Sequence, residues 1–115
     1  MSDDCIFCKI LRGEIPSDVV HEGENVIAFR DINPQAPVHV LVIPRRHIPT
    51  IEDFGPGDHG LIGEIFDVSR EVARQEGIAD EGYRTVFNCR DAGCQDVYHV
   101  HLHVLGGRQM TWPPG

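Results

Sequence analysis

The sequence predicts an α+β fold in which residues 1–115 form a single domain. About five short segments alternate apolar with polar residues or are rich in β-branched residues, which is the pattern of strands. One long segment carries apolar residues at helical spacing, and one shorter helical segment precedes the strands. Because short links join most of these segments, the strands favour antiparallel pairing. One long and one short helix leave one sheet face thinly covered, so we expect a homodimer to complete the fold.

The first element is a short helix at residues 5–12. Asp3 or Asp4 supplies a capping carboxylate for its first turn. Gly13 ends the helix, because glycine readily adopts the backbone conformation that follows a last helical turn. The apolar stripe of this helix consists of Ile6, Phe7, Ile10 and Leu11.

The strands are predicted from alternation and from the turn residues between them. Gly23, Glu24 and Asn25 form a hairpin turn, and two prolines stiffen the loop at residues 31–37. Pro44 ends the third strand. The predicted strands are residues 19–22, 26–29, 38–43, 83–88 and 99–105.

The long helix covers residues 58–76 and is closed by Gly77. Its other face is charged and is expected to face solvent. A loop at residues 90–96 leads into the last strand, and the tail from residue 108 contains two prolines that rule out regular structure. The apolar positions of the helix are Leu61, Ile62, Ile65, Phe66, Val68, Val72 and Ala73.

Composition excludes two classes of partner. The chain has 18 acidic and 10 basic residues, which gives a formal net charge of −8. Nucleic acids and anionic membranes attract basic surfaces, so neither is an expected partner. No apolar run approaches the ~20 residues that cross a bilayer, and a cytoplasmic location is expected. A small phosphorylated ligand is still compatible, since backbone N–H groups and imidazoles can hold one phosphate.

Three histidines dominate the last predicted strand. His99, His101 and His103 alternate with apolar residues, which places them on one face at a spacing of ~6.6–7 Å. The residues between them are then expected to face the core. A solvent-facing row of imidazoles is unusual for an ordinary strand, and it favours metal binding or catalysis.

Two further features are open to more than one interpretation. Cys5 and Cys8 are three residues apart, so a helix brings both thiols to one face. In an intracellular protein such a pair favours metal or redox chemistry, although two packed cysteines would give the same pattern. His39 interrupts an otherwise apolar strand, either as a core histidine or as part of a site.

The segment His99-Val100-His101-Leu102-His103-Val104-Leu105 resembles the signature of the histidine triad (HIT) family. Its Gly106-Gly107-Arg108-Gln109-Met110 extension and the ending Trp112-Pro113-Pro114-Gly115 resemble the Hint branch, the nucleoside phosphoramidases. The resemblance implies a homodimeric hydrolase that releases the nucleoside monophosphate from purine nucleoside phosphoramidates. Other family-like segments are Cys5-Ile6-Phe7-Cys8-Lys9-Ile10, Ala28-Phe29-Arg30-Asp31-Ile32, Pro34-Gln35-Ala36-Pro37 and Ile43-Pro44-Arg45-Arg46-His47-Ile48.

The resemblance also assigns roles by position. His101 matches the family nucleophile, on which a nucleotidyl-histidine forms, and His103 and His39 match catalytic histidines beside it. Either of these two can protonate the leaving amine. Asp31 matches a carboxylate that holds the ribose hydroxyls, although it can also cap a turn before Pro34. The nucleotide-binding residues implied are Phe29, Asp31, Ile32, Asn88, Gln95, Asp96, His99 and Trp112, the last reaching the partner's site.

Some family members bind zinc at positions matching Cys5, Cys8, His47 and His99. Two thiolates and two imidazoles form a closed, structural type of Zn²⁺ site. If it forms here, His99 is a metal ligand rather than a catalytic group.

The loop before the triad departs from the family pattern Gly-Gln-Ser/Thr-Val. Cys94 replaces the glycine, which restricts the backbone if a positive φ is needed. Asp96 places a carboxylate where an anionic substrate is expected, which costs affinity unless the side chain points away or is protonated. Cys94 and Asp96 favour an alternative to the phosphoramidase, a nucleotide- or zinc-binding module that mediates interactions without catalysis. A second alternative is a dinucleoside-polyphosphate hydrolase of the neighbouring Fhit-like branch, which the Trp112-Pro113-Pro114-Gly115 ending disfavours.

Overall fold

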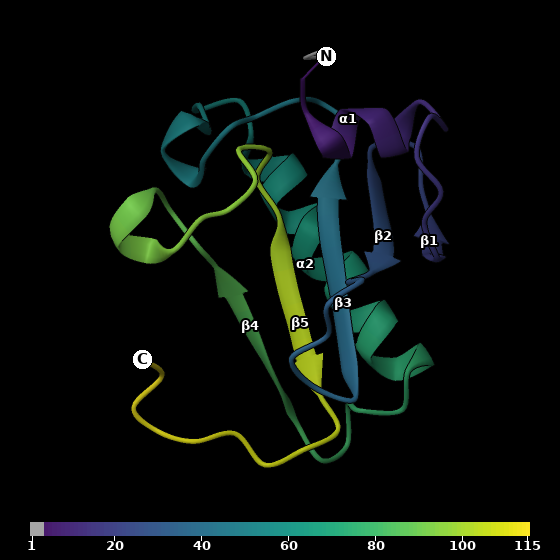
Figure 1. Ribbon diagram of the computed structural model, residues 1–115, viewed down its shortest axis with the longest axis vertical. Helices are drawn as coiled ribbons and strands as arrows, with labels where there is room; N and C mark the ends of the chain where they lie inside the picture. The colour runs from purple at the N-terminus through teal and green to yellow at the C-terminus, as the bar shows by residue number, and fades with distance from the viewer. Residues whose placement is uncertain (1–3) are drawn as a thin grey trace.

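Five antiparallel strands form one sheet in the order β1-β2-β3-β5-β4 (Figure 1). The first three strands follow one another, whereas β5 inserts between β3 and β4 after the chain has passed through the long helix α2. The structure is a computed structural model that describes residues 4–115. The strands are β1 (Val19–Glu22), β2 (Val26–Arg30), β3 (Val38–Pro44), β4 (Tyr83–Phe87) and β5 (Leu102–Gly106).

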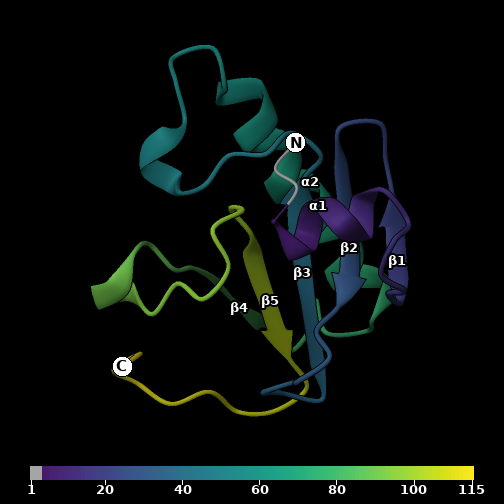
Figure 2. The same ribbon diagram turned by 45° about the horizontal axis from the view of Figure 1, so that its top comes forward.

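Each face of the sheet is covered by a different helix. The long helix α2 (His59–Gln75) packs behind the sheet, whereas the short helix α1 (Ile6–Leu11) lies in front of its upper part (Figures 1 and 2). Alternation divides the strand residues between these two faces. The core beneath α2 includes Val26, Ala28, Val40, Val42, Leu102 and Val104, and the core beneath α1 includes Ile27, Phe29, Leu41 and Ile43.

The predicted fold class is confirmed, with differences at several element ends. The thiol of Cys5, rather than Asp4, caps α1 by accepting a hydrogen bond from the Cys8 N–H. The other predicted cap, Asp3, lies outside the described residues. Ile6 was expected in the apolar stripe of α1, but the side chain is 44% exposed because it follows the cap on the outer side of the helix.

The histidine-rich strand begins later than predicted. β5 starts at Leu102, so the backbone of His99 and His101 lies in the approach to the strand. Pro44 ends β3 opposite this point and has no N–H with which to continue the ladder. The predicted alternation still holds, since Val100, Leu102 and Val104 are fully or almost fully buried.

Two short 3₁₀ helices, η1 (Ile51–Asp53) and η2 (Asp91–Gly93), were not predicted from periodicity. The C-terminal tail runs below the ends of β4 and β5 without regular structure (Figure 1), as its prolines predict. Among residues 4–115, no helix combines the length and apolar character needed to cross a membrane.

Candidate active site and metal cluster

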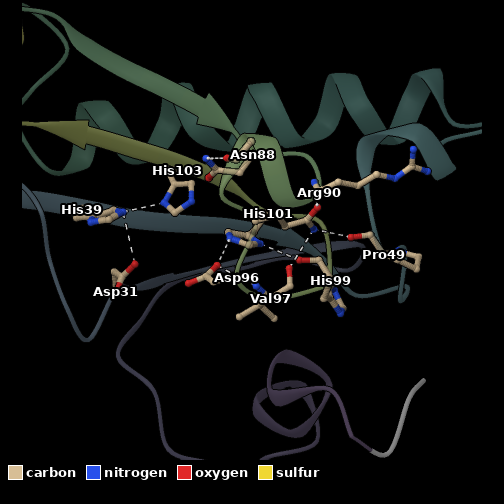
Figure 3. A network of polar contacts seen from close by, with 12 residues as sticks. Asp31, His39, Pro49, Asn88, Arg90, Asp96, Val97, His99, His101 and His103 are labelled. Carbon is tan, nitrogen blue, oxygen red and sulfur yellow. Dashed lines mark hydrogen bonds and ion pairs between the residues drawn. The ribbon is translucent and has the colours of Figure 1, made fainter. Parts of the chain in front are cut away.

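The pairing of β3 with β5 brings distant histidines together on the α1 face of the sheet. In this register His39 lies opposite Leu105, and Leu41 lies opposite His103. The approach to β5 then adds His101 beside His103, with their ring centroids 4.9 Å apart. Figure 3 shows these three imidazoles in a row along the strands.

His101 is held with one ring nitrogen free. Its Nδ1 lies 2.8 Å from the carbonyl oxygen of His99, and because a carbonyl only accepts, Nδ1 carries the proton. Nε2 of neutral His101 therefore presents a lone pair. The nearest carboxylate is Asp96, whose Oδ1 lies 3.7 Å from that Nε2 and accepts a hydrogen bond from the N–H of Val97.

His39 and His103 form a directed pair. The backbone N–H of Gln35 donates to Nδ1 of His39 over 3.0 Å, so the His39 proton is on Nε2. That Nε2 donates to Nδ1 of His103 over 2.9 Å, which leaves the proton of neutral His103 on its own Nε2. Asp31 supports the pair, with its Oδ2 3.5 Å from Nε2 of His39.

Burial favours the neutral forms of His39 and His103. Desolvation, reinforced by neighbouring His101 and His39, lowers the pKa of His103 from 6.5 to about 4. Desolvation also lowers the pKa of His39, against the opposing effect of the Asp31 carboxylate. The Asp31 carboxylate also acts to raise the pKa of His103. A bound anion would raise the pKa of His103 in the same way, because negative charge stabilises the imidazolium form.

A second cluster, of possible metal ligands, joins helix α1 to the segment after β3 and to the approach to β5. The Sγ atoms of Cys5 and Cys8 are 3.4 and 3.6 Å from Nδ1 of His99, and Nδ1 of His47 is 3.3 Å from it. The facing atoms of these four residues all lie within 4.8 Å of one another.

The donor set of this cluster fits a metal ion. Nε2 of His99 donates to the carbonyl oxygen of Pro44 over 2.8 Å, so Nδ1 has its lone pair directed at the thiols. Burial lowers the pKa of His99 to about 4 and raises the pKa of Cys5. Two sulfurs and two imidazole nitrogens are the ligands of structural zinc. A hollow of about 370 Å³ beside the cluster is lined by Asp4, Cys5, Ile6, His47, Asp96, Val97 and Tyr98.

A family model described as HIT domain matches residues 12–110. The chain belongs to the HIT domain family. It is 48% identical over 110 residues to the purine nucleoside phosphoramidase of Escherichia coli strain K12, covering 96% of this chain and 92% of that relative. A 14 kDa zinc-binding protein from Zea mays is 50% identical over 123 residues, covering 96% of this chain and 87% of the relative. The solved structure of a HIT family hydrolase from Legionella pneumophila Philadelphia 1 superposes with a TM-score of 0.95 at 55% identity, covering 97% of this chain and all (100%) of that one.

These findings confirm the family resemblance, the expected fold and the hydrolase class. The four residues expected to bind zinc, Cys5, Cys8, His47 and His99, lie together as a group that can hold a metal ion. His99 belongs to this group, and its side chain is fully buried against the two cysteines. Its backbone carbonyl points the other way and accepts the hydrogen bond from His101.

The residues expected to bind the nucleotide differ in where the structure places them, and it does not bring all of them to the triad. Phe29 is buried beneath α1, whereas Ile32 and Trp112 are 95% and 81% exposed. Asn88 is half-buried near His103 (Figure 3), and its amide donates to the carbonyl of Gly93. Oδ1 of Asp31 accepts from the N–H of Asn33, so the turn interaction considered for this residue is present.

Gln95 has no amide group to spare for a ligand. Its Oε1 accepts from the backbone N–H of Arg90, and its Nε2 donates to the carbonyls of Pro49 and Val97. The side chain therefore ties the loop before the triad to the segment after β3.

Three further groups contact the clustered histidines, and the sequence did not assign them to the site. The N–H of Gln35 and the carbonyl of Pro44 fix two histidine tautomers, but backbone groups leave no signal in residue type. Phe7 packs edge-on against the ring of His101. The position of Phe7 between Cys5 and Cys8 could have indicated that it lies near the site, but Phe7 was predicted only as part of the apolar stripe of the helix.

Proposed function

We propose that this HIT hydrolase cleaves the P–N bond of purine nucleoside 5′-monophosphoramidates and releases the nucleoside monophosphate. The observation that supports this most directly is the orientation of His101, because its Nδ1–H···O=C bond leaves Nε2 as a neutral nucleophile. The similarity to a purine nucleoside phosphoramidase supports the substrate class.

In the first step, the Nε2 lone pair of His101 attacks phosphorus as the P–N bond breaks. The departing amine requires a proton. We assign its delivery to the His39–His103 pair, with His103 as the donor, because its Nε2–H is not used in the hydrogen bond with His39. The anionic phosphoryl group and Asp31 both stabilise imidazolium, so the extra proton enters the pair as substrate binds.

In the second step, water attacks the nucleotidyl-histidine. The new P–O bond replaces the bond between phosphorus and Nε2, and His101 returns to its neutral form. This intermediate is itself a phosphoramidate, but its leaving group, the Nδ1-protonated imidazole of His101, needs no further proton. The His39–His103 pair, which gave up its extra proton in the first step, instead takes a proton from the attacking water.

The substrate's nucleoside is assigned to the open side of the triad. Asp31 is the proposed partner of the ribose hydroxyls, with Phe29 and Ile32 on the base side and Asn88 and Asp96 on the phosphate side. Gln95, which the sequence placed in this binding set, is proposed instead to hold the loop that carries Asp96, because its amide is bonded within the fold. We further propose that the enzyme is a homodimer in which Trp112 reaches the partner's site, which accounts for the exposure of its side chain. Nucleic acids and membranes are not proposed as partners of this acidic chain, and its proposed location is the cytoplasm.

Zinc is the proposed occupant of the Cys5, Cys8, His47 and His99 cluster. When bound, it supplies structural cross-linking rather than chemistry at phosphorus, since all four ligand positions come from the protein.

The deciding experiment measures AMP release from adenosine 5′-phosphoramidate by the intact protein and by His101→Ala. We expect the variant to lose turnover by about 10³-fold or more while still binding AMP, because the nucleophile is removed but the binding groups remain. His59→Ala is the matched control, since His59 is exposed at the start of α2.

Three results would contradict parts of this assignment. Full turnover by His101→Ala would exclude His101 as the nucleophile. Faster cleavage of diadenosine polyphosphates than of the phosphoramidate would favour the Fhit-like hydrolase. AMP binding without turnover of either substrate would favour an interaction module.

A further inference from the structure

The ring of Phe7 links the metal cluster to the proposed nucleophile. Phe7 is 6% exposed and lies in α1 between Cys5 and Cys8, two members of the cluster. Its ring centroid is 5.1 Å from that of His101 at an interplanar angle of 87°, and 5.9 Å from that of His99. This edge-to-face geometry is favourable for aromatic pairs and restricts how the imidazole can tilt.

A second connection runs through the backbone of His99. The side chain of His99 faces the cluster through Nδ1, while its carbonyl oxygen accepts the Nδ1–H of His101. The hydrogen bond of His99 to Pro44 anchors the same residue to the end of β3. From the side of the cluster, His101 is thus restrained by one hydrogen bond and one ring contact, in addition to the ring of His103 and the Asp96 carboxylate on its other side.

Helix α1, which carries Phe7, is held in place both by the apolar core beneath it and by the residues of the cluster. Helix α1 has six residues, too few for a helix to be stable by itself in water. Its cap is the Cys5 thiol, and its Cys8 thiol lies 3.4 Å from Nδ1 of His47. A metal held by all four groups would join α1 to two segments that are 39 and 91 residues from Cys8.

We propose that Phe7 is a positioning residue for His101, and that metal binding to Cys5, Cys8, His47 and His99 fixes Phe7 and the His99 carbonyl together. The loaded cluster thereby sets the direction in which Nε2 of His101 points. This inference rests on the proposed role of His101 as the nucleophile.

The test follows the His101 ring directly. The full chain is freed of metal with a chelator and titrated with Zn²⁺, and ¹⁵N imidazole NMR reports the His101 tautomer, assigned by comparison with His101→Gln. We expect zinc to shift the His101 resonances of the wild type toward one Nδ1-protonated species. In Phe7→Leu, zinc should still bind one to one, but the His101 response should fall to about half or less, because one of the two restraints that come from the side of the cluster is lost.

Kinetics of the zinc-loaded proteins give the second readout. For Phe7→Leu we expect kcat to fall about 10- to 100-fold, as misplacement of a reacting group by about 1 Å does. AMP affinity should change less than kcat, because among the residues proposed to hold the nucleotide Phe7 touches only the base-side residue Phe29, at a centroid distance of 5.4 Å, while the groups proposed for the ribose and the phosphate are unchanged. Phe54→Leu is the matched control, because Phe54 packs against the core on the α2 face. Phe7→Met keeps the test usable if Phe7→Leu does not fold.

The outcomes separate this inference from the proposed function. It would be overturned if the wild type binds no zinc, if zinc leaves the His101 resonances unchanged, or if Phe7→Leu matches Phe54→Leu in both readouts. If His101 responds to zinc through Phe7 but no protein turns over the phosphoramidate, the positioning role is supported and the proposed function is wrong.

Discussion

At position 94 the backbone adopts a conformation that suits glycine better than cysteine. Cys94 has φ 60° and ψ 39°, in the left-handed region where a Cβ atom is crowded. The sequence identified this position as one where a glycine is typical of the family, and the structure confirms that a positive φ is required. The strained backbone conformation of Cys94 therefore destabilises the loop that leads into the triad.

We therefore expect Cys94→Gly to increase the free energy of unfolding by about 1 kcal/mol, because glycine adopts this φ without strain. Urea denaturation monitored by circular dichroism measures the change. Cys94→Ala is the matched control, since it removes the exposed thiol but keeps a Cβ atom at the same φ. Equal stabilisation by both variants would show that the thiol, rather than the backbone, is responsible.

Asp96 is the second residue at which this chain departs from the family loop. Its carboxylate does not point away from the site, because Oδ1 lies 3.7 Å from Nε2 of His101 (Figure 3). Its side chain is 80% exposed, so water weakens its field but does not remove it.

We expect Asp96→Asn to lower the KM for adenosine 5′-phosphoramidate about fivefold at low salt, which corresponds to about 1 kcal/mol between unit charges ~4 Å apart in water. The gain should shrink in ~0.5 M salt, where screening is strong. Steady-state kinetics at both salt concentrations check this. Asp67→Asn, on the outer face of α2, should change neither value. An unchanged or higher KM for Asp96→Asn would mean that Asp96 has a favourable contact with substrate.

Residue roles differed in how far the sequence could predict them. Alternation alone placed His99, His101 and His103 opposite the core, because side-chain direction in a strand depends only on spacing. The tautomers could not be predicted, since they depend on carbonyl and N–H groups that tertiary structure supplies. His39 stayed open for the same reason: only the pairing of β3 with β5 shows that it meets His103.

At the scale of elements, periodicity located the helices and strands to within about two residues in most cases. The prediction failed where a partner rather than the segment itself decides the boundary. β5 begins at Leu102 because its neighbour β3 ends in Pro44, and α1 is capped by a cysteine that is not among the preferred N-cap residues. Strand order likewise depends on the route of α2 across the sheet, which no local pattern records.

The burial of His103, where β5 pairs with β3, makes the free energy of unfolding depend on pH. Because the pKa of His103 is lowered from 6.5 to about 4, the unfolded chain binds a proton that the folded chain does not between these values. Stability is therefore expected to decrease as pH falls from about 6.5 to about 4, and to be insensitive to His103 above that range.

Urea denaturation at pH 7 and pH 5 measures this slope in metal-free protein. His103→Gln should reduce the loss of stability on acidification, by up to about 1 kcal/mol per pH unit, because it removes one of the protons taken up on unfolding. His59→Gln, at an exposed position, should leave the slope unchanged. A slope equally steep in His103→Gln and the wild type would assign the acid sensitivity to other groups.

For the whole molecule, the two edges of the sheet are the candidate surfaces for contact with a partner chain. The edge strands are β1 and β4, and each has an exposed apolar side chain on or beside it. Beside β4, Phe66 of α2 stacks edge-on with Phe87 at a centroid distance of 6.2 Å and is 41% exposed. On β1, Val19 is exposed to the same 41%. Phe66 was predicted to face the core, but its side chain is partly exposed. Because it lies beside an edge strand, a partner chain could cover it.

We expect the homodimer to form through the β4 edge, so that Phe66→Glu dissociates it into monomers by placing a charge in the interface. Sedimentation velocity at matched concentrations measures the mass of each protein, and Trp112 fluorescence reports whether the tail loses its contact with the partner. Val19→Glu is the matched control, because it adds the same charge at an equally exposed apolar position on the opposite edge. Dissociation by Val19→Glu but not by Phe66→Glu would place the interface at β1. A wild type that sediments as a monomer would exclude the dimer and the proposed role of Trp112 together.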